Sequence, residues 1–342
     1  MCIRDRVTGG AGFIGSAFIR LALTHDWAAR LINLDKLTYA GNLENLSTVE
    51  NDPRYRFVHA DICDTARMRL LLDEERPDAI VHFAAESHVD RSILGPGAFV
   101  ETNVLGTCSL LEAARAAQTP RFLHVSTDEV YGSIDEPADA DESYPLKPSS
   151  PYSASKAGSD LLALSYFTTF KMPVVITRAS NNYGPFQFPE KLIPLMISNA
   201  IEDRPLPIYG DGLQVRDWLF VEDHCRAIWA ALNHGREGAI YNIGGSRALP
   251  NREVVRQILA QLGKPESLVT RVADRPGHDR RYAITTARIE QATGWQAEVP
   301  FEQGLAQTIQ WYRENPGWIG RVKSGAYQSY YGKNYGAREP RP

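Results

Sequence analysis

The sequence predicts an α/β fold, a doubly wound parallel sheet followed by a smaller C-terminal lobe. Short apolar runs alternate with longer stretches of helical periodicity up to about residue 179, which is the pattern of repeated strand–helix units. The runs "DAIVHFAA" (78–85) and "PVVITRA" (173–179) are apolar almost throughout, as expected of strands buried on both faces. A glycine-rich turn, "VTGGAGFIGS", follows the first strand, and together these observations indicate a Rossmann-like sheet.

Periodicity and composition predict each element in turn. Helical stretches are marked by apolar residues recurring every three or four positions, and strands by short apolar runs that end in polar residues. Ser150 is a suitable N-cap and Pro151 a suitable first residue for the longest helix. The expected elements are, in order, helix 13–24, strand 30–35, strand 55–61, helix 64–76, strand 78–85, helix 97–117, strand 121–127, helix 151–170 and strand 173–179.

Two segments break this rhythm. Residues 133–150 are polar, acidic and contain prolines, which predicts a solvated loop over the sheet. After about residue 180, Pro and Gly clusters loosen the alternation and predict the smaller lobe. We therefore expect a nucleotide-binding domain over 1–180, with some later returns to the sheet, and a second lobe formed mainly by 181–342.

The composition of the first strand does not suit its expected position in the centre of the sheet. It reads "MCIRDRV", with Arg4, Asp5 and Arg6 where a central strand needs aliphatic side chains. Three buried charges would be costly, so we expect a distorted or weakened first strand. We interpret the first six residues as foreign to the protein's natural start.

Composition narrows the classes of function. A net charge of −4 gives no electrostatic basis for binding nucleic acid or an anionic membrane, and no apolar run is long enough to span a bilayer. We therefore expect a cytoplasmic location. The four cysteines lie far apart and the eight histidines lack ligand spacing, so no metal site is predicted.

A dinucleotide site is predicted at the glycine turn. Gly9, Gly12 and Gly15 allow a tight turn and a close approach of the backbone to a pyrophosphate at the helix N-terminus. Asp35 ends the second strand 20 positions after Gly15, where a carboxylate accepts the ribose hydroxyls. An acid there favours NAD over NADP, although the neighbouring Lys36 weakens this preference slightly.

A tyrosine and a lysine on the longest helix form a candidate catalytic pair. Tyr152 and Lys156 are four residues apart, so they lie on one helical face. A nearby ammonium group and a bound nicotinamide cation would both lower the pKa of the phenol. The phenolate can then take a proton from a sugar hydroxyl as hydride leaves for NAD⁺, and Thr127 is placed to bond the same hydroxyl.

With these motifs in place, the chain resembles the extended short-chain dehydrogenase/reductase family. "TGGAGFIG" and "YSASK" carry that resemblance, and "AAESHVDRSI", "STDEVYG", "SNNYGPFQFPEKLIPL" and "ADRPGHDRRYAI" extend it to the nucleotide-sugar 4,6-dehydratases of this family. It covers nearly the whole chain except the first six residues. It implies a lyase that dehydrates dTDP-glucose to dTDP-4-dehydro-6-deoxy-glucose with NAD. Other sugar-nucleotide 4,6-dehydratases, 4-epimerases and decarboxylases of the family stay open as alternatives.

The resemblance also assigns roles to the adjacent acids "DE" at 128–129. Oxidation of C4 of the sugar makes the C5 proton acidic, so a base must remove it while an acid protonates the departing C6 hydroxyl. Repulsion between close carboxyls raises the pKa of one of them, which suits one neutral and one ionised group. By resemblance, Asp128 is the acid and Glu129 the base.

Further contacts are implied by resemblance alone. The implied cofactor contacts are Phe13, Ile14, Asp35, Lys36, Leu37, Thr38, Asp61, Ile62, Phe83, Ala84, Ala85, Glu86, Ser87, Thr102 and Asn182, beside Tyr152 and Lys156. The implied substrate contacts are Ser87, Thr127, Asn181, Lys191, Leu192, Pro207, Ile208, Tyr209, Arg216, Asn251, Asp274, Arg275, Pro276, Gly277 and His278. The forked N–H donors of Arg216 and Arg275 suit a diphosphate, and the ring of Tyr209 offers a stacking face for a base. The resemblance also implies a homodimer formed through helices 100–117 and 153–170.

Overall fold

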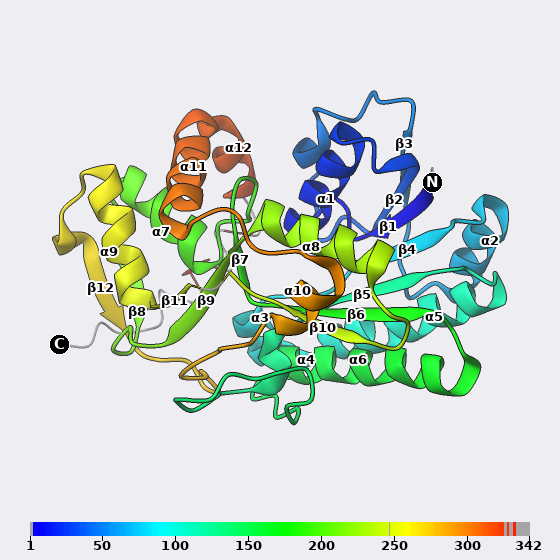
Figure 1. The fold of residues 1–342 in the computed structure, drawn as a ribbon. Helices are drawn as coiled ribbons and strands as arrows, with labels where there is room; N and C mark the ends of the chain where they lie inside the picture. The colour runs from blue at the N-terminus through cyan, green and yellow to red at the C-terminus, as the bar shows by residue number, and fades with distance from the viewer. Residues whose placement is uncertain (1–2, 246, 325–326, 328–330, 333–342) are drawn as a thin grey trace.

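The protein was analysed as a computed structural model, which describes residues 3–245, 247–324, 327 and 331–332 (Figure 1). Seven parallel strands form the central sheet in the spatial order β10-β6-β5-β4-β1-β2-β3. Their bounds are β1 Ile3–Thr8, β2 Ala28–Asp35, β3 Tyr55–His59, β4 Ala79–His82, β5 Phe122–Thr127, β6 Val174–Ala179 and β10 Ile240–Ile243. The predicted doubly wound parallel sheet is confirmed. The strand order reverses between β1 and β4, where such sheets bind their ligands.

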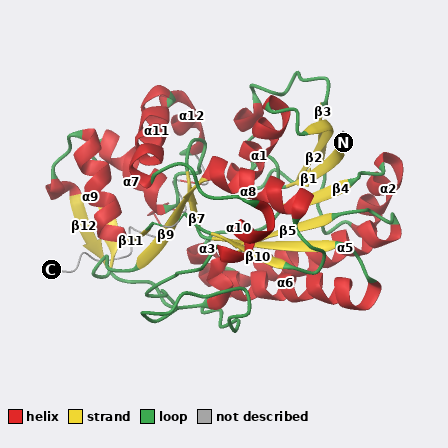
Figure 2. Ribbon diagram, in the orientation of Figure 1, coloured by secondary structure: helices red, strands yellow, loops and turns green. Residues whose placement is uncertain are grey.

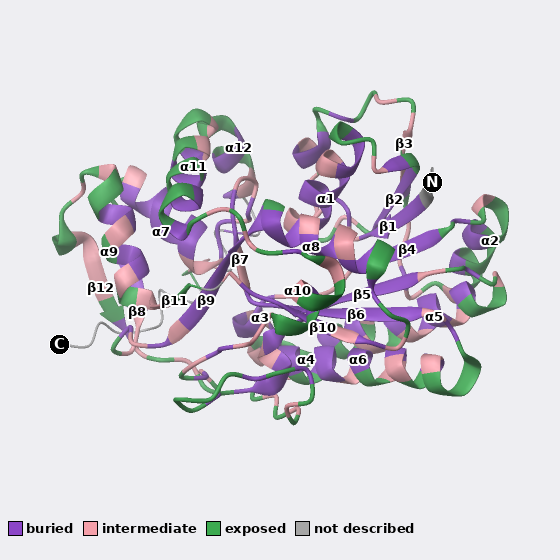
Figure 3. Cartoon of the chain, in the orientation of Figure 1, coloured by how far each residue is buried: buried purple, intermediate pink, exposed green. Residues whose placement is uncertain are grey.

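Helices cover both faces of this sheet (Figure 2). On one face lie α1 (Phe13–Thr24), α8 (Val221–His234) and α10 (Ala287–Thr293). On the other lie α2 (Thr65–Glu75), α5 (Thr107–Ala116) and α6 (Pro151–Phe170). Each face has its own apolar core, and the strands between them are mostly buried, except for the edge strand β3, where Arg56 and His59 are exposed (Figure 3).

The ends of α1 and α6 agree with the sequence-based expectation. The predicted spans 13–24 and 151–170 match the observed helices. At α6 the Ser150 hydroxyl accepts the backbone N–H of Ser153, while the Ser153 hydroxyl accepts the N–H of Ser150, so both ends of this capping box are satisfied. Pro151 is the first residue of the helix, and Lys171 ends it in the left-handed region at φ +57°. This rigid start fixes where the first turn of α6 points.

The expected helix over 97–117 is built from three consecutive pieces. They are α4 (Pro96–Phe99), η2 (Val100–Gly106), which has π-helical turns, and α5. Gly106 lies against the side chain of Ile62, where an added Cβ would come within 2.7 Å of Ile62 Cδ1. The wider turns of η2 thus bring the helix close to the loop after β3. Just before it lies the short α3 (Val89–Leu94).

A second lobe follows β6. It holds β7 (Asn181–Tyr183), β9 (Val215–Phe220) and β11 (Ala248–Pro250) in one sheet, and β8 (Leu206–Tyr209) with β12 (Val269–Val272) in another. A separate apolar core joins these strands to their helices, α7 (Leu192–Ile201), α9 (Asn251–Leu262), α11 (Phe301–Glu314) and α12 (Pro316–Val322). Short 3₁₀ turns complete the fold: η1 (Leu43–Leu46), η3 (Asp128–Tyr131) and η4 (Glu266–Leu268). Since α8 and β10 return to the main sheet, the boundary at residue 180 stays a prediction.

The loop 133–150 is less solvated than its composition predicts. Ile134 and Ala140 are fully buried, and Ala140 forms a bridge with Ile284. The Arg281 guanidinium donates to Asp139 at 2.7 Å, which ties the acidic part of the loop to the segment before α10. The loop therefore lies folded against the rest of the protein, with contacts to β10 of the main sheet as well as to the segment before α10.

The first strand pairs regularly from Arg4 to Thr8, and the expected distortion is limited to a register shift between Ile3 and Arg4. The expected weakening of the strand stays a prediction. Backbone pairing does not depend on side-chain chemistry. The free-energy cost of burying charged groups therefore appears at the side chains and not in the strand geometry. Asp5 is 1% exposed, and neither carboxylate oxygen has a hydrogen-bond partner among the described residues. Burial, and then the charge of Asp78, raises the pKa of Asp5 to about 7, and burial lowers the pKa of Arg6 to about 10.

We predict that Asp5→Val stabilises the protein, most strongly at alkaline pH. The ordinary pKa of the carboxyl is 3.8 and its folded value is about 7, so the folded state binds the extra proton between these values. Stability consequently falls as pH rises through that window. A penalty of roughly 4 kcal/mol corresponds to a Tm gain of about 5 °C at pH 8, with a smaller gain at pH 5. Calorimetry at both pH values measures this.

The control for that variant is Asp73→Asn, which changes an exposed carboxylate on α2. It should leave Tm within about 1 °C at both pH values, as surface changes usually do. An unchanged Tm for Asp5→Val at pH 8 would contradict the interpretation of the first strand.

Candidate functional site

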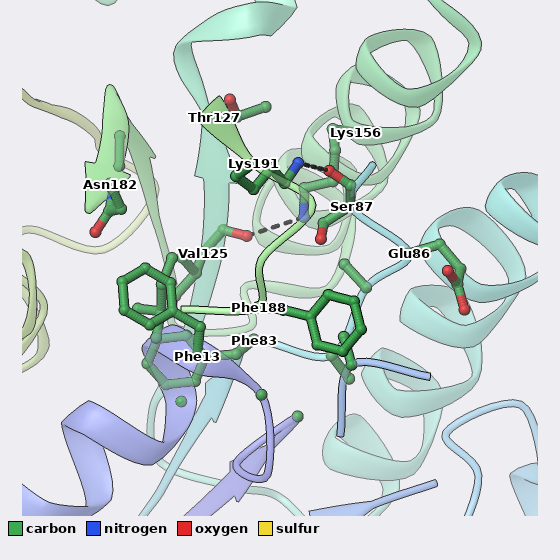
Figure 4. Close-up of a pocket in the computed structure, with 18 of the residues that line it drawn as sticks. Phe13, Phe83, Glu86, Ser87, Val125, Thr127, Lys156, Asn182, Phe188 and Lys191 are labelled. Carbon is green, nitrogen blue, oxygen red and sulfur yellow. Dashed lines mark hydrogen bonds between the residues drawn. The ribbon is translucent and has the colours of Figure 1, made fainter. Parts of the chain in front are cut away.

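A cavity of about 330 Å³ opens where the carboxyl ends of β1, β4, β5 and β6 meet β7 and the start of α7 (Figure 4). Its aromatic lining, Phe13, Phe83 and Phe188, lies along one side in Figure 4, and the polar groups Thr127, Lys156 and Lys191 lie on the other. Two hydrogen bonds cross its wall, from Lys156 Nζ to Val125 O at 2.9 Å and from Lys191 Nζ to Ser87 O at 2.6 Å.

The glycine turn forms the floor of the cavity where β1 passes into α1. Gly9 has φ +73°, and a Cβ there would lie 2.6 Å from Ala84 N. At Gly15 a Cβ would lie 2.4 Å from Gly9 O, so strand and helix touch through bare backbone. Helix α1 begins at Gly12 without a side-chain cap. Such a turn suits the close approach of a pyrophosphate to a helix N-terminus.

Asp35 shapes the loop after β2. Its Oδ2 accepts the N–H of Ala11 at 2.9 Å and its Oδ1 the N–H of Leu37 at 2.8 Å. Burial raises the pKa of this carboxyl, and these two backbone bonds oppose the rise. Lys36 Nζ lies 2.6 Å from Asp61 Oδ2, so the lysine that weakened the preference for NAD is already paired with an acid.

The predicted cofactor contacts converge on this cavity with one exception. Leu37 does not line it among the described residues; its N–H instead serves the Asp35 carboxylate. The predicted contacts that line the cavity are Gly9, Gly12, Phe13, Ile14, Gly15, Asp35, Lys36, Thr38, Asp61, Ile62, Phe83, Ala84, Ala85, Glu86, Ser87, Thr102, Tyr152, Lys156 and Asn182. Residues from several separate segments thus meet around one space.

Tyr152 and Lys156 both line the cavity and both are buried. The predicted lowering of the Tyr152 pKa by Lys156 is not found: burial and then the Glu129 carboxylate raise this pKa, and a hydrogen bond with Thr127 opposes them. The Lys156 ammonium instead donates to the Val125 carbonyl. Burial lowers the pKa of Lys156 to about 8, and Asp160 works in the opposite direction.

A buried polar network lies below this pair. Asp160, one turn after Lys156 on α6, accepts Arg178 Nε at 2.8 Å and lies 3.3 Å from His124 Nε2. Arg178 also donates to the Tyr131 hydroxyl at 3.0 Å. The Arg178 and His124 contacts hold the pKa of Asp160 below its ordinary value although burial opposes them. These contacts therefore fix the middle of α6 to β5 and β6.

The adjacent acids occupy unlike surroundings at the end of β5. Burial, followed by the charges of Glu129 and Asp217, raises the pKa of Asp128 well above its ordinary value. Burial raises the pKa of Glu129 as well, but Lys191, Arg275 and Arg216 oppose the rise. Thr127 accepts the N–H of Glu129 and so turns the chain into η3. Asp128 is the acid more easily kept neutral, and Glu129 the one more easily ionised.

The predicted substrate contacts form two groups. One group lines the cavity: Ser87, Thr127, Asn181, Lys191 and Leu192. The other lies outside the described lining: Pro207, Ile208, Tyr209, Arg216, Asn251, Asp274, Arg275, Pro276, Gly277 and His278. The second group is nevertheless close to the acids, because Arg216 and Arg275 both act on the Glu129 carboxylate.

Several of the predicted substrate contacts outside the cavity lining also contact one another. The Tyr209 and His278 rings meet edge to face with centroids 5.9 Å apart, and the Tyr209 hydroxyl donates to Asp90 Oδ2 at 2.7 Å. Arg275 Nε lies 3.7 Å from the other oxygen of Asp90. The shared contact with Asp90 thus links the Tyr209 ring to Arg275, which also acts on Glu129, and an aromatic ring with arginines is a combination suited to a base and a diphosphate.

Several lining residues were not predicted from the sequence. They are Ala40, Gly41, Ser126, Gln187, Phe188, Glu190, Trp218 and His224, among others. Phe188 and Glu190 lie inside the quoted run "SNNYGPFQFPEKLIPL". The sequence analysis therefore identified the motif but assigned no role to these two residues. His224 Nδ1 lies 2.8 Å from Asn182 Oδ1, a contact between α8 and β7 that no spacing in the sequence reveals. The described residues contain no cluster of three potential metal ligands and no helix suited to crossing a bilayer.

Comparison with known proteins identifies related chains. Residues 7–308 match the model of the family described as GDP-mannose 4,6 dehydratase. A relative from Salmonella typhimurium (strain LT2) named dTDP-glucose 4,6-dehydratase is 49% identical over 358 residues, which cover 97% of this chain and 99% of the relative. A relative of the same name from Xanthomonas campestris pv. campestris (strain B100) is 52% identical over 340 residues, with 94% and 96% covered.

Solved structures give the same grouping. DesIV, a dTDP-glucose 4,6-dehydratase from Streptomyces venezuelae solved with NAD bound, superposes with a TM-score of 0.92 at 54% identity over 94% of this chain and 100% of that chain. The UDP-glucose 4-epimerase of Thermus thermophilus, in complex with NAD, gives a TM-score of 0.84 at 31% identity over 92% and 100%.

Proposed function

The chain belongs to the dTDP-glucose 4,6-dehydratase family, and on that premise we propose that it converts dTDP-glucose to dTDP-4-dehydro-6-deoxy-glucose and water with NAD. The observation that carries the proposal is that Asp128 and Glu129 line the same cavity as Thr127 and Tyr152, in unlike electrostatic surroundings. Loss of water needs an acid and a base at once, whereas epimerisation at C4 needs neither carboxyl. Higher identity to the dehydratases than to the epimerase supports the same choice.

The residues present fit NAD. Gly9 and Gly15 leave a backbone cradle that any Cβ would fill, and Asp35 would face the adenosine ribose. Pairing of Lys36 with Asp61 leaves an acidic environment that would repel a 2′-phosphate. When bound, NAD would supply reversible hydride transfer, as the acceptor for the hydride of C4 and the donor to C6 of the sugar.

Tyr152 is the base for the first step. Its phenolate removes the C4 hydroxyl proton, and the Thr127 hydroxyl, which bonds Tyr152, orients the same oxygen. Burial and the charges of Glu129, Asp128 and Asp160 raise the pKa of Tyr152, so the phenolate needs nearby positive charge. Lys156, one turn along α6, donates to the Val125 carbonyl and has no such effect on Tyr152, so the bound nicotinamide cation would supply that charge.

The two acids complete the elimination. The Glu129 carboxylate, near Lys191, Arg275 and Arg216, removes the C5 proton made acidic by the C4 ketone. Asp128, whose neutral form is favoured by burial, gives its proton to the C6 oxygen, and water leaves as the C5–C6 double bond forms. After C6 is reduced, Glu129 returns a proton to C5. At the end of the cycle Glu129 is restored, while Asp128 has lost one proton to the departing water and Tyr152 has gained one from the C4 hydroxyl. A net transfer of one proton from Tyr152 to Asp128 therefore completes the cycle.

Recognition of the nucleotide is assigned to the second group of contacts. Tyr209 would stack on the base, and Arg216 and Arg275 would hold the diphosphate with their forked donors. The remaining candidate is a dehydratase acting on a GDP-sugar, which the description of the matching family model favours. Full-length relatives named for dTDP-glucose at 49–52% identity favour dTDP.

We also propose that the protein is a homodimer in the cytoplasm. Leu94, Val100, Leu105 and Leu161 are 66%, 50%, 60% and 57% exposed, and they lie on the neighbouring elements α3, η2 and α6. Exposed apolar side chains gathered on adjacent helices are typical of a surface that a second copy covers. Free thiols at Cys63, Cys108 and Cys225 are consistent with a reducing compartment.

Turnover tests the proposed function directly. The purified chain with NAD⁺ should convert dTDP-glucose to a 4-keto sugar, followed by its ultraviolet absorbance in alkali. UDP-glucose, GDP-mannose and GDP-glucose serve as comparison substrates, and we expect at least about tenfold lower kcat/KM for each, because each presents a different base, and in one case also a different sugar, to the site. A product from a GDP-sugar alone would overturn the dTDP assignment.

Glu129→Gln separates the steps of the proposed mechanism. We expect C4 oxidation to persist, while C5 exchange with solvent deuterium falls at least about 100-fold because the base is lost. Mass spectrometry of the recovered sugar measures the exchange. The companion variant Asp128→Asn should keep C5 exchange and lose elimination of water. Exchange at the wild-type rate in Glu129→Gln would refute the role of Glu129.

The homodimer is tested by light scattering after size exclusion. The wild type should elute at twice the 38.1 kDa mass of the chain. A double change, Leu105→Asp with Leu161→Asp, should shift it to the monomer mass, because burying two carboxylates in an apolar interface is costly. Leu70→Asp, at an exposed leucine on α2, should remain dimeric. A monomeric wild type at micromolar concentration would exclude the dimer.

A further inference from the structure

Three segments far apart in the sequence meet at one buried carboxylate, Glu190, whose side chain is 3% exposed. Its Oε1 accepts the Tyr39 hydroxyl at 2.8 Å, and its Oε2 accepts Arg91 Nε at 2.9 Å. The Arg91 guanidinium also lies 3.7 Å above the centre of the Tyr39 ring. Carboxylate, phenol and guanidinium therefore form a closed triad in which each member touches the other two.

Each member belongs to a different part of the site. Tyr39 follows Thr38 in the loop shaped by Asp35, and this loop lines the cofactor side of the cavity. Arg91 lies on α3, four residues after Ser87. Glu190 precedes Lys191 at the entrance to α7, in the second lobe. The triad thus joins three parts of the site: the loop after β2, called here the cofactor loop, the turn after β4, and the second lobe.

Two neighbouring bonds reinforce the connection on the substrate side. His88 Nε2 lies 3.2 Å from the backbone carbonyl of Glu190, and Lys191 Nζ donates to the carbonyl of Ser87 at 2.6 Å. Any displacement of Glu190 must therefore move Lys191, which is one of the three cations that favour the ionised form of Glu129.

We propose that Glu190 is a positioning residue that couples the two binding sites: through Tyr39 and Arg91 it fixes the cofactor loop and Lys191 in one mutual arrangement. Since both its oxygens are occupied by these partners, it acts through them and not on the substrate. Ordering of the loop by NAD then orders Lys191, so each ligand should bind more tightly when the other is present. This inference rests on the proposed function, because it takes dTDP-glucose as the second ligand.

A second ion pair provides a natural comparison. Glu44 and Arg321 also join the region after β2 to the second lobe, with Arg321 Nη2 2.6 Å from Glu44 Oε2. These side chains are 42% and 61% exposed, so water screens the pair and its contribution is small. Glu190 is buried, and loss of its charge leaves Arg91 and Tyr39 without their shared acceptor. Only the buried connection is expected to transmit coupling.

The experiment measures the affinity of the NAD-free full-length chain for NAD⁺ by calorimetry, without and with saturating dTDP. We expect dTDP to tighten NAD⁺ binding at least about fivefold in the wild type, the lower end of common allosteric couplings. In Glu190→Gln this factor should fall below about two, and the KM for dTDP-glucose should rise about tenfold while kcat stays within about threefold. Glu44→Gln is the control and should keep the wild-type factor.

Tyr39→Phe provides a second, milder variant, which keeps the ring beneath Arg91 and removes only the hydroxyl donated to Glu190. It should lower the coupling factor in the same direction, and it carries the test if Glu190→Gln does not fold. A wild-type factor near one, or an unchanged factor in the two variants, would overturn the inference while leaving turnover of dTDP-glucose intact. Failure of the wild type to bind dTDP would overturn both the inference and the proposed function.

Discussion

Asp128 and Glu129 stand next to each other at the buried end of β5, so the protein must hold two carboxyls where neither is well solvated. The two carboxyls can be held together because the charged groups around them differ. The charges of Glu129 and Asp217 add to the rise in the pKa of Asp128, and Arg216 opposes it, whereas three cations, Lys191, Arg275 and Arg216, oppose the rise at Glu129, to which Asp279 adds. One group is thereby biased towards its neutral form and the other towards its charged form. The rest of the site serves to keep these neighbours in place.

That arrangement depends on both lobes. The Rossmann-like sheet delivers the acids, Thr127 and α6, while Lys191, Arg216 and Arg275 come from the chain after β6. Below the site, the contacts of Asp160 with Arg178 and His124 fix α6 to two strands. Beside the site, Glu190 with Tyr39 and Arg91 joins the second lobe to the cofactor loop. The electrostatics of the site are therefore a property of how the lobes meet.

The first strand shows how much misfit a parallel sheet tolerates. Asp5 and Arg6 are buried in the middle of the sheet, yet pairing with β2 and β4 is continuous from Asp5 to Thr8. Backbone hydrogen bonds and the surrounding apolar core maintain the strand, and the penalty is a pair of buried polar side chains with unmet hydrogen bonds among the described residues. The expected distortion is confined to the register shift between Ile3 and Arg4, because buried charge affects the side chains more than the backbone pairing, and the expected weakening of the strand stays a prediction.

Local chemistry was sufficient for much of this protein. Gly9, Gly15 and Asp35, the capped start of α6 at Ser150 and Pro151, and the pair Tyr152 and Lys156 could be predicted because each depends on neighbours within a few residues or on one turn of helix. The unlike environments of Asp128 and Glu129, the donation of Lys156 to Val125 and the triad at Glu190 could not. Their partners lie on other strands and in the second lobe, up to 151 residues away for Tyr39 and Glu190. The sequence by itself determined which chemical groups the chain carries and which element holds each one. Only the tertiary structure decided their charge states and partners, because these depend on burial and on distances across the fold.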